Sequence, residues 1–110
     1  MRLPMRIFID DIRDPKDGRE WTVVRTYDEA IAAIIPNLGL ITEISFDHDL
    51  GQGDGKEGYD VASAIERHVH DQCLTNVPVL HVHSRNPAGR ERLQLVFDSI
   101  FRIALSNETK

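Results

Sequence analysis

Four aspartates stand out in this sequence because of where they fall relative to its apolar runs. Asp10 and Asp11 directly follow one short run of β-branched and aromatic residues. Asp47 directly follows another, and Asp49 comes two residues later. Runs of this kind are typical of buried strands, so both acidic pairs are expected at strand exits. If the two strands are neighbours, about 4.8 Å apart, the carboxylates converge on one spot.

Carboxylates gathered in this way repel one another unless a cation lies among them. Hard oxygen ligands suit Mg²⁺ or Mn²⁺, which usually take one or two carboxylates, waters and a substrate phosphate. We therefore predict a metal site formed by Asp10, Asp11, Asp47 and Asp49. The alternative is that these aspartates only cap loops and neighbouring helices, since Asp is common at turns.

Two histidines alternate with apolar residues in the segment 78–84. On a strand, His81 and His83 would point to the same side. His83 lies nearer the strand exit, and its intrinsic pKa near physiological pH suits it to protonate a leaving alkoxide or to bind a metal. We expect structural roles for His81, which lies deeper in the strand, and for His48.

A hydroxyl, a helix start and a guanidinium follow this strand directly. Asn86 is a favoured N-cap residue, and proline at position 87 suits the first helical position. Free N–H groups at such a helix end favour anions. We therefore predict that Ser84, Asn86 and Arg90 bind phosphate. An ordinary capped loop is the alternative, although it does not account for Arg90.

The elements that must position these residues alternate between strands and helices. Such alternation implies a parallel sheet with helices on both faces, a three-layer α/β sandwich that binds ligands at the carboxyl ends of its strands. The connection between the first two strands is rich in turn formers and short for a parallel crossover. We expect strands at 6–9, 21–26, 41–46 and 78–84, and helices after Thr26, up to about Cys73, and from Pro87 onwards.

The glycine-rich segment 50–58 matches the spacing of a dinucleotide fingerprint at Gly53, Gly55 and Gly58. We reject that interpretation, because acidic residues intervene after the strand and the next strand ends in His-Ser instead of the acid that would bind ribose. A flap over the acidic site and a plain solvated loop are both consistent with this composition.

Length and composition predict one globular domain spanning residues 1–110. Apolar residues make up 41% of the chain and charged residues 28%, close to the globular average. The net charge of −5 argues against an extended nucleic-acid surface, which needs a basic face. No apolar run approaches the roughly 20 residues of a membrane span. With no signal-like segment and a lone Cys73, the expected location is the cytoplasm.

Several segments together resemble a known family. The acidic pair after the first strand, the acid after the third strand and the hydroxyl after the fourth resemble response-regulator receiver domains. More closely, they resemble the receiver-like family named for cyclic-phosphate processing. The matching segments are 8–13, 44–51, 58–60 and 83–89, which read FIDDIR, ISFDHDLG, GYD and HSRNPAG.

The resemblance implies a receiver-like, flavodoxin-like fold, here truncated to about four mainly parallel strands. It also implies action on cyclic phosphates of nucleotides or RNA ends, in a setting such as RNA repair. By position, Asp10 and Asp11 would hold a divalent cation, Asp47 would lie where a receiver accepts phosphate, and Ser84 would touch a phosphate oxygen. The fifth strand of a receiver and its lysine are missing, so phosphorelay is not expected.

The leading hypothesis is a metal-dependent phosphoesterase that opens a cyclic phosphate, with Asp47 and His83 as its catalytic residues. Its ligand would be a cyclic or phosphorylated nucleotide or an RNA end. Two alternatives stay open. One is a non-catalytic module that binds such a ligand at the same edge, and the other is a degenerate receiver acting in protein interaction, as a homodimer through its last helix.

Overall fold

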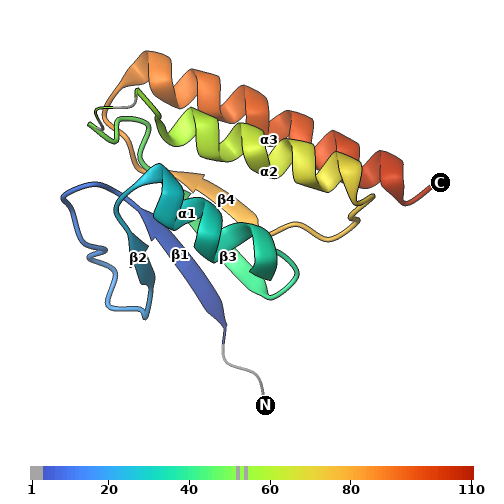
Figure 1. Cartoon of the computed structure of the whole chain (residues 1–110), viewed down its shortest axis with the longest axis horizontal. Helices are drawn as coiled ribbons and strands as arrows, with labels where there is room; N and C mark the ends of the chain where they lie inside the picture. The colour runs from blue at the N-terminus through green and yellow to red at the C-terminus, as the bar shows by residue number, and fades with distance from the viewer. Residues whose placement is uncertain (1–3, 52, 54) are drawn as a thin grey trace.

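The computed structural model describes residues 4–51, 53 and 55–110. Its centre is a four-stranded sheet in which every pair of neighbouring strands is parallel, with the order β2-β1-β3-β4 (Figure 1). The strands are β1 (Met5–Ile9), β2 (Thr22–Val24), β3 (Ile41–Phe46) and β4 (Val79–Val82). The helices are α1 (Tyr27–Ile34), α2 (Gly58–Asp71) and α3 (Pro87–Asn107), with a short 3₁₀ turn, η1 (Ile35–Asn37), after α1. The receiver-like α/β fold predicted from the sequence is confirmed.

The first and last helices begin at the caps that the sequence indicated. Thr26 Oγ1 accepts the backbone N–H of Glu29 at 3.1 Å and so starts α1. Asn86 Oδ1 accepts the N–H of Gly89 at 3.1 Å and starts α3. These side chains satisfy donors that would otherwise have no partner within the helix.

The cap of α2 differs from the common pattern. Glu57 caps the backbone of Asp60, and the Asp60 carboxylate accepts the Glu57 N–H at 2.8 Å, which makes a reciprocal capping box. Glutamate is not a favoured N-cap residue, so the sequence signalled this helix start only weakly.

One face of the sheet and the helices form the core. On the two central strands, Ile7 and Ile9 of β1 and Ile44 and Phe46 of β3 are fully buried. They join one apolar cluster with residues from α1, α2 and α3. The helices contact one another in series, and α2 and α3 lie side by side along their length (Figure 1). Truncating Phe46 to alanine in such a core costs about 3–5 kcal/mol.

The structure differs from the expected three layers, because no described helix covers the opposite face of the sheet. The crossovers β2-α1-β3 and β3-α2-β4 run in the same direction along the sheet, so right-handed connections place both helices on the same face. Only β1-β2 runs the other way, and its connection, residues 10–21, contains no helix. In its place Trp21 packs edge-on against Phe8, with ring centroids 5.8 Å apart.

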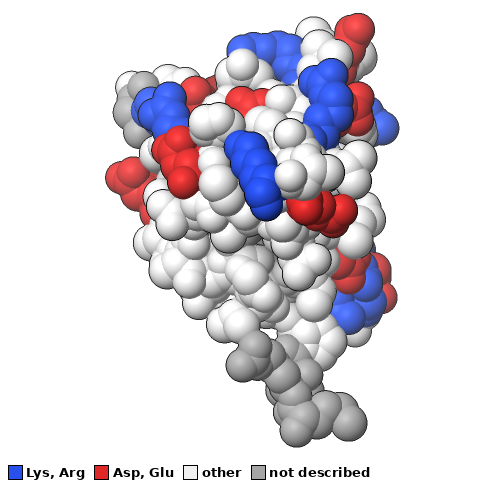
Figure 2. Space-filling view, turned by 90° about the vertical axis from the view of Figure 1, so that its right-hand side faces the viewer, with Lys and Arg blue, Asp and Glu red and all other residues white. Residues whose placement is uncertain are grey.

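Charges of both signs are interspersed on the face seen from the side where the C-terminus lies (Figure 2). Basic and acidic side chains alternate across its upper part, and uncharged residues occupy its middle. Among the described residues, no helix has the length and apolar character needed to span a membrane.

Candidate functional site

The strand exits meet at one edge of the sheet, and backbone hydrogen bonding continues one residue beyond β1, β3 and β4. Hydrogen bonds of the sheet, and not loops, therefore fix the backbone positions of three of the predicted site residues. The backbone N–H of Asp10 donates to Val24 O at 3.1 Å, that of Asp47 to Ile9 O at 2.9 Å, and that of His83 to Phe46 O at 3.0 Å.

Asp10 is fully buried, and four donors surround its carboxylate. Oδ1 accepts the backbone N–H groups of Ile12 at 3.0 Å and of Arg13 at 2.8 Å. Oδ2 accepts Arg13 Nε–H at 3.1 Å and lies 3.1 Å from His83 Nε2. Burial alone would raise the pKa of Asp10, but these donors outweigh it, so the pKa is lowered and the carboxylate is charged.

Asp47 lies beside Asp10, but its surroundings stabilise the charged carboxylate less well. It is 4% exposed, and Arg13 Nη2 lies 3.5 Å from its Oδ2. Burial, together with the negative charge of Asp10, raises the pKa of Asp47 above its ordinary value. Gly58 at the start of α2 lies against the backbone carbonyl of Asp47, where any Cβ would collide with it. The close approach of α2 to this strand exit therefore needs glycine.

Three of the four predicted carboxylates form one group. Oxygen atoms of Asp10, Asp11 and Asp47 all lie within 4.8 Å of one another. The donor set is entirely hard oxygen, and two of its members are buried, which fits Mg²⁺ or Mn²⁺. Burial and the charge of Asp10 raise the pKa of Asp47, and the nearby charge of Arg13 offsets them only in part. These residues could therefore hold a divalent cation.

His83 is fixed on three sides. Its ring stacks on Phe8, Ser45 Oγ lies 2.7 Å from Nδ1, and Asp10 Oδ2 lies 3.1 Å from Nε2. Burial lowers the pKa of His83, and the hydrogen bond and charge of Asp10 offset this only in part. The imidazole is therefore neutral at pH 7. Because a carboxylate can only accept, the hydrogen is on Nε2, and Nδ1 accepts the Ser45 hydroxyl.

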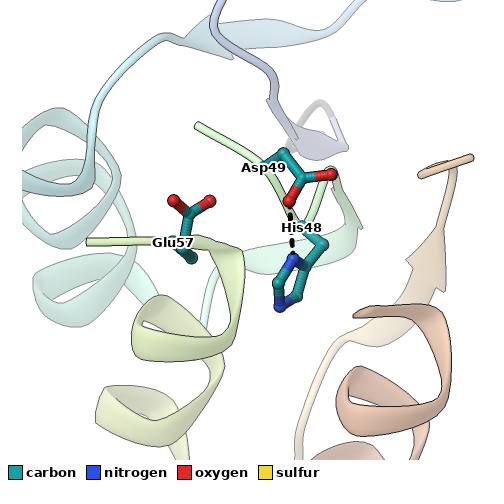
Figure 3. A group of neighbouring side chains, drawn as sticks. All are labelled: His48, Asp49 and Glu57. Carbon is teal, nitrogen blue, oxygen red and sulfur yellow. Dashed lines mark hydrogen bonds and ion pairs between the residues drawn. The ribbon is translucent and has the colours of Figure 1, made fainter. Parts of the chain in front are cut away.

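Asp49, predicted as a fourth metal ligand, lies outside this group. Its Oδ1 is 3.0 Å from His48 Nδ1, and its carboxylate accepts Asn86 Nδ2–H at 3.3 Å (Figure 3). With His48 and Glu57 it forms a second group whose ligand atoms lie within 4.8 Å of one another. However, Glu57 Oε2 already accepts the backbone N–H of Leu50 at 2.7 Å, and the other ring nitrogen of His48 points away from both carboxylates (Figure 3).

His48 serves as packing between elements, as the sequence suggested. Its side chain is 9% exposed, and its ring lies so close to Gly89 of α3 that a Cβ there would collide with it. Its backbone carbonyl accepts the Gly58 N–H at 2.8 Å. His48 thus joins the exit of β3 to the starts of α2 and α3. His81 lies on the uncovered sheet face, where its Nε2 is 3.0 Å from Glu43 Oε1.

A cavity of about 460 Å³ opens at this edge, and both predicted metal ligands and predicted phosphate ligands line it. Carboxylates line one part of it, and a hydroxyl, an amide and two guanidiniums line the rest. The lining residues are Asp11, Ile12, Arg13, Asp47, Asp49, Ser84, Arg85 and Asn86.

The predicted phosphate ligands fall into two sets. Ser84 and Asn86 line the cavity, and Ser84 Oγ accepts the Asn86 N–H at 3.2 Å while its hydroxyl can still donate. Arg90 is not among the lining residues, and its Nη1 donates to Ser84 O at 3.2 Å. In this arrangement Arg90 steadies the loop, and Arg85 offers a guanidinium to the cavity.

Sequence reasoning missed two residues of the site. Arg13 lies three residues after Asp10, and a basic residue at that spacing in a turn was the available signal. Ser45 is a buried polar residue between two apolar positions of β3, an arrangement that calls for a polar partner. That partner is His83.

Comparison with known proteins agrees with the geometry. A family model for the cyclic-phosphate processing receiver domain matches residues 5–99, which include every predicted site residue. No curated protein and no solved structure matches the chain. On its fold and the extent of this match, the chain belongs to the family of cyclic-phosphate processing receiver domains.

Proposed function

We propose that this domain is a metal-dependent phosphoesterase that opens cyclic phosphates of nucleotides or of RNA ends. One observation supports the proposal above all. The same cavity is lined by carboxylates suited to a divalent cation and by Ser84, Arg85 and Asn86, which are suited to a phosphate. The family name points to the same class of ligand.

Asp10, Asp11 and Asp47 would hold Mg²⁺ or Mn²⁺. When bound, such a cation would polarise the phosphoryl group and acidify a water molecule. Asp49, which lies at the cavity wall and bonds to Asn86, would orient that amide toward the phosphate.

The remaining residues would act on the phosphate and the leaving group. Ser84, Asn86 and Arg85 would bind phosphate oxygens, with Arg90 holding the Ser84 carbonyl in place. Water would form a bond to phosphorus as the bond from phosphorus to one ribose oxygen breaks. His83 would act in its imidazolium form, which gives a proton to that ribose oxygen and becomes the neutral imidazole, while the water loses a proton to solvent.

The test is hydrolysis of 2′,3′-cyclic mononucleotides, 3′,5′-cyclic mononucleotides and cyclic oligonucleotides, with and without Mn²⁺. We expect turnover of at least one class in wild type and a loss of about 100-fold or more in Asp47→Asn. Asp98→Asn is the matched control, because it makes the same chemical change at an exposed position of α3. The enzyme proposal is lost if every substrate survives or if Asp47→Asn is as active as wild type.

The same experiment separates the proposal from a binding module. Each substrate that survives is then titrated against the wild-type protein and Asp47→Asn. Saturable binding that depends on Asp47, without any product, would identify a non-catalytic receptor for that ligand.

A further inference from the structure

Arg13 occupies a position between the two buried carboxylates of the site. Its Nε lies 3.1 Å from Asp10 Oδ2, and its Nη2 lies 3.5 Å from Asp47 Oδ2. Its guanidinium therefore supplies the positive charge that Asp10 and Asp47 share. The Arg13 side chain is nevertheless 38% exposed, and it lines the cavity that also contains Ser84 and Asn86.

Asp10 has no acceptor position to spare. A carboxylate offers about four lone-pair sites. Those of Asp10 face two backbone N–H groups, Arg13 Nε and His83 Nε2. A cation that binds Asp10 must therefore displace a donor.

Only one of these donors can leave at little cost. The two backbone groups belong to the turn 10–13, and releasing them would unfold it. His83 is held by the Phe8 stack and by Ser45. The Arg13 side chain is long and partly exposed, and within the described part of the chain these ion pairs are its only side-chain anchors, which makes it the donor that a cation would replace.

We infer that Arg13 couples cation binding to phosphate binding: a divalent cation at Asp10 and Asp47 displaces the guanidinium, which then binds the ligand phosphate in the same cavity. The inference rests on the proposed cation site. A guanidinium has the planar fork that matches a phosphate, so the displaced Arg13 has a better partner once phosphate is present. By linkage, phosphate must then tighten cation binding by the same factor.

A purely structural role makes the opposite prediction. If Arg13 only clamps the turn after β1, its removal would leave Asp10 and Asp47 less well held. Cation affinity would then fall or stay constant. The direction of the change in cation affinity therefore separates the two roles.

The experiment is an NMR titration of backbone amides with Mg²⁺ at constant ionic strength, with and without saturating inorganic phosphate. In wild type we expect phosphate to raise the Mg²⁺ affinity about fivefold or more. In Arg13→Gln we expect Mg²⁺ alone to bind severalfold more tightly than in wild type, with the effect of phosphate reduced. Arg102→Gln is the matched control, because it removes the same charge from an exposed position of α3 that does not line the cavity.

Two further measurements distinguish the coupling role of Arg13 from a folding defect in Arg13→Gln. Arg13→Lys keeps the charge but loses the fork, so it should show intermediate coupling. The Nε–H resonance of Arg13 can be assigned as the one that is absent from the spectrum of Arg13→Lys. In wild type, adding Mg²⁺ should move the chemical shift of this resonance away from the value of a hydrogen-bonded Nε–H. If that resonance keeps its shift while Mg²⁺ saturates the amides of Asp10 and Asp47, the inference is overturned.

The outcomes also distinguish this inference from the proposed function. If Mg²⁺ perturbs the acidic cluster but Arg13→Gln behaves like Arg102→Gln, the coupling role is wrong and the cation site stands. If Mg²⁺ leaves Asp10, Asp11 and Asp47 unperturbed in wild type and in Arg13→Gln, both the cation site and the coupling role fail.

Discussion

The imidazole of His83 lies flat against the phenyl ring of Phe8, with ring centroids 4.3 Å apart and ring planes inclined by 4°. Phe8 belongs to β1 and His83 directly follows β4, and these two strands are separated in the sheet by β3. Ser45 of β3 lies between them in the sheet and bonds to His83 Nδ1 at 2.7 Å. The orientation of the histidine is thus set by side chains of the two central strands, β1 and β3.

We expect Phe8→Leu to cost about 1 kcal/mol of stability while releasing the His83 ring, because leucine keeps much of the apolar volume but not the stacking face. ¹⁵N imidazole shifts should change from one dominant tautomer in wild type to a mixture in the variant. Phe97→Leu is the control, since Phe97 packs against Phe46 and not against His83. An unchanged tautomer in Phe8→Leu would show that stacking does not fix the ring.

The stability of the protein should fall on mild acidification because of His83. Burial lowers the pKa of His83, so below its ordinary value of 6.5 the unfolded chain takes up this proton more readily than the folded protein. The contribution of neutral His83 to the stability of the fold is therefore fully present above pH 6.5 and is lost as pH falls below this value. The free energy of unfolding, measured with urea between about pH 7.5 and 5.5, should vary less with pH in His83→Gln than in wild type. Parallel profiles would contradict this assignment.

Replacing Asp47 should stabilise the fold even though it removes a proposed ligand. Burial and the charge of Asp10 raise the pKa of Asp47, so the folded protein binds this proton more readily than the unfolded chain does. Wild-type stability is therefore lost as pH rises from 3.8 through the raised pKa. Asp47→Asn should melt at a higher temperature than wild type at pH 7, with a gap that narrows toward pH 4. A lower melting temperature at pH 7 would refute the prediction.

Gly89→Ala should destabilise the protein by about 1–3 kcal/mol, because the new methyl group would overlap the His48 ring. The displaced imidazole should also weaken the contact between Asp49 and Asn86, which NMR shifts of the Asn86 side-chain amide would report. Gly39→Ala is the matched control, since nothing lies within 4 Å of a Cβ at that position. Equal stability of the two variants would mean that α3 can move away from His48.

The residues that sequence patterns brought together are those fixed by strand ends. Asp10, Asp47 and His83 each directly follow the last residue of a strand, and parallel strands end at one edge. Three residues after a strand, this logic fails. Asp49 has left the line of the sheet, and its direction is set by the partners His48 and Asn86, which no local pattern encodes.

Arg13 could not be placed from the sequence for a different reason. Its side chain is long and begins in a connection without periodicity, so only tertiary structure decides which acid it meets. The uncovered sheet face also depended on tertiary information. Alternating strands and helices predict the layers, but the direction of each crossover decides which face every helix takes.

The backbone hydrogen bonds of the sheet continue through Asp10, Asp47 and His83, and this affects how fast this edge of the sheet can open. Amides that share hydrogen bonds with central strands open only with the largest cooperative unit of a protein, whereas connecting segments open locally and often. Hydrogen–deuterium exchange at these three amides should therefore be as slow as at Ile44 in the middle of β3. We therefore expect the edge that carries the candidate site to belong to the part of the molecule that opens most slowly, with rapid motion left to side chains such as Arg13 that reach it from outside the sheet.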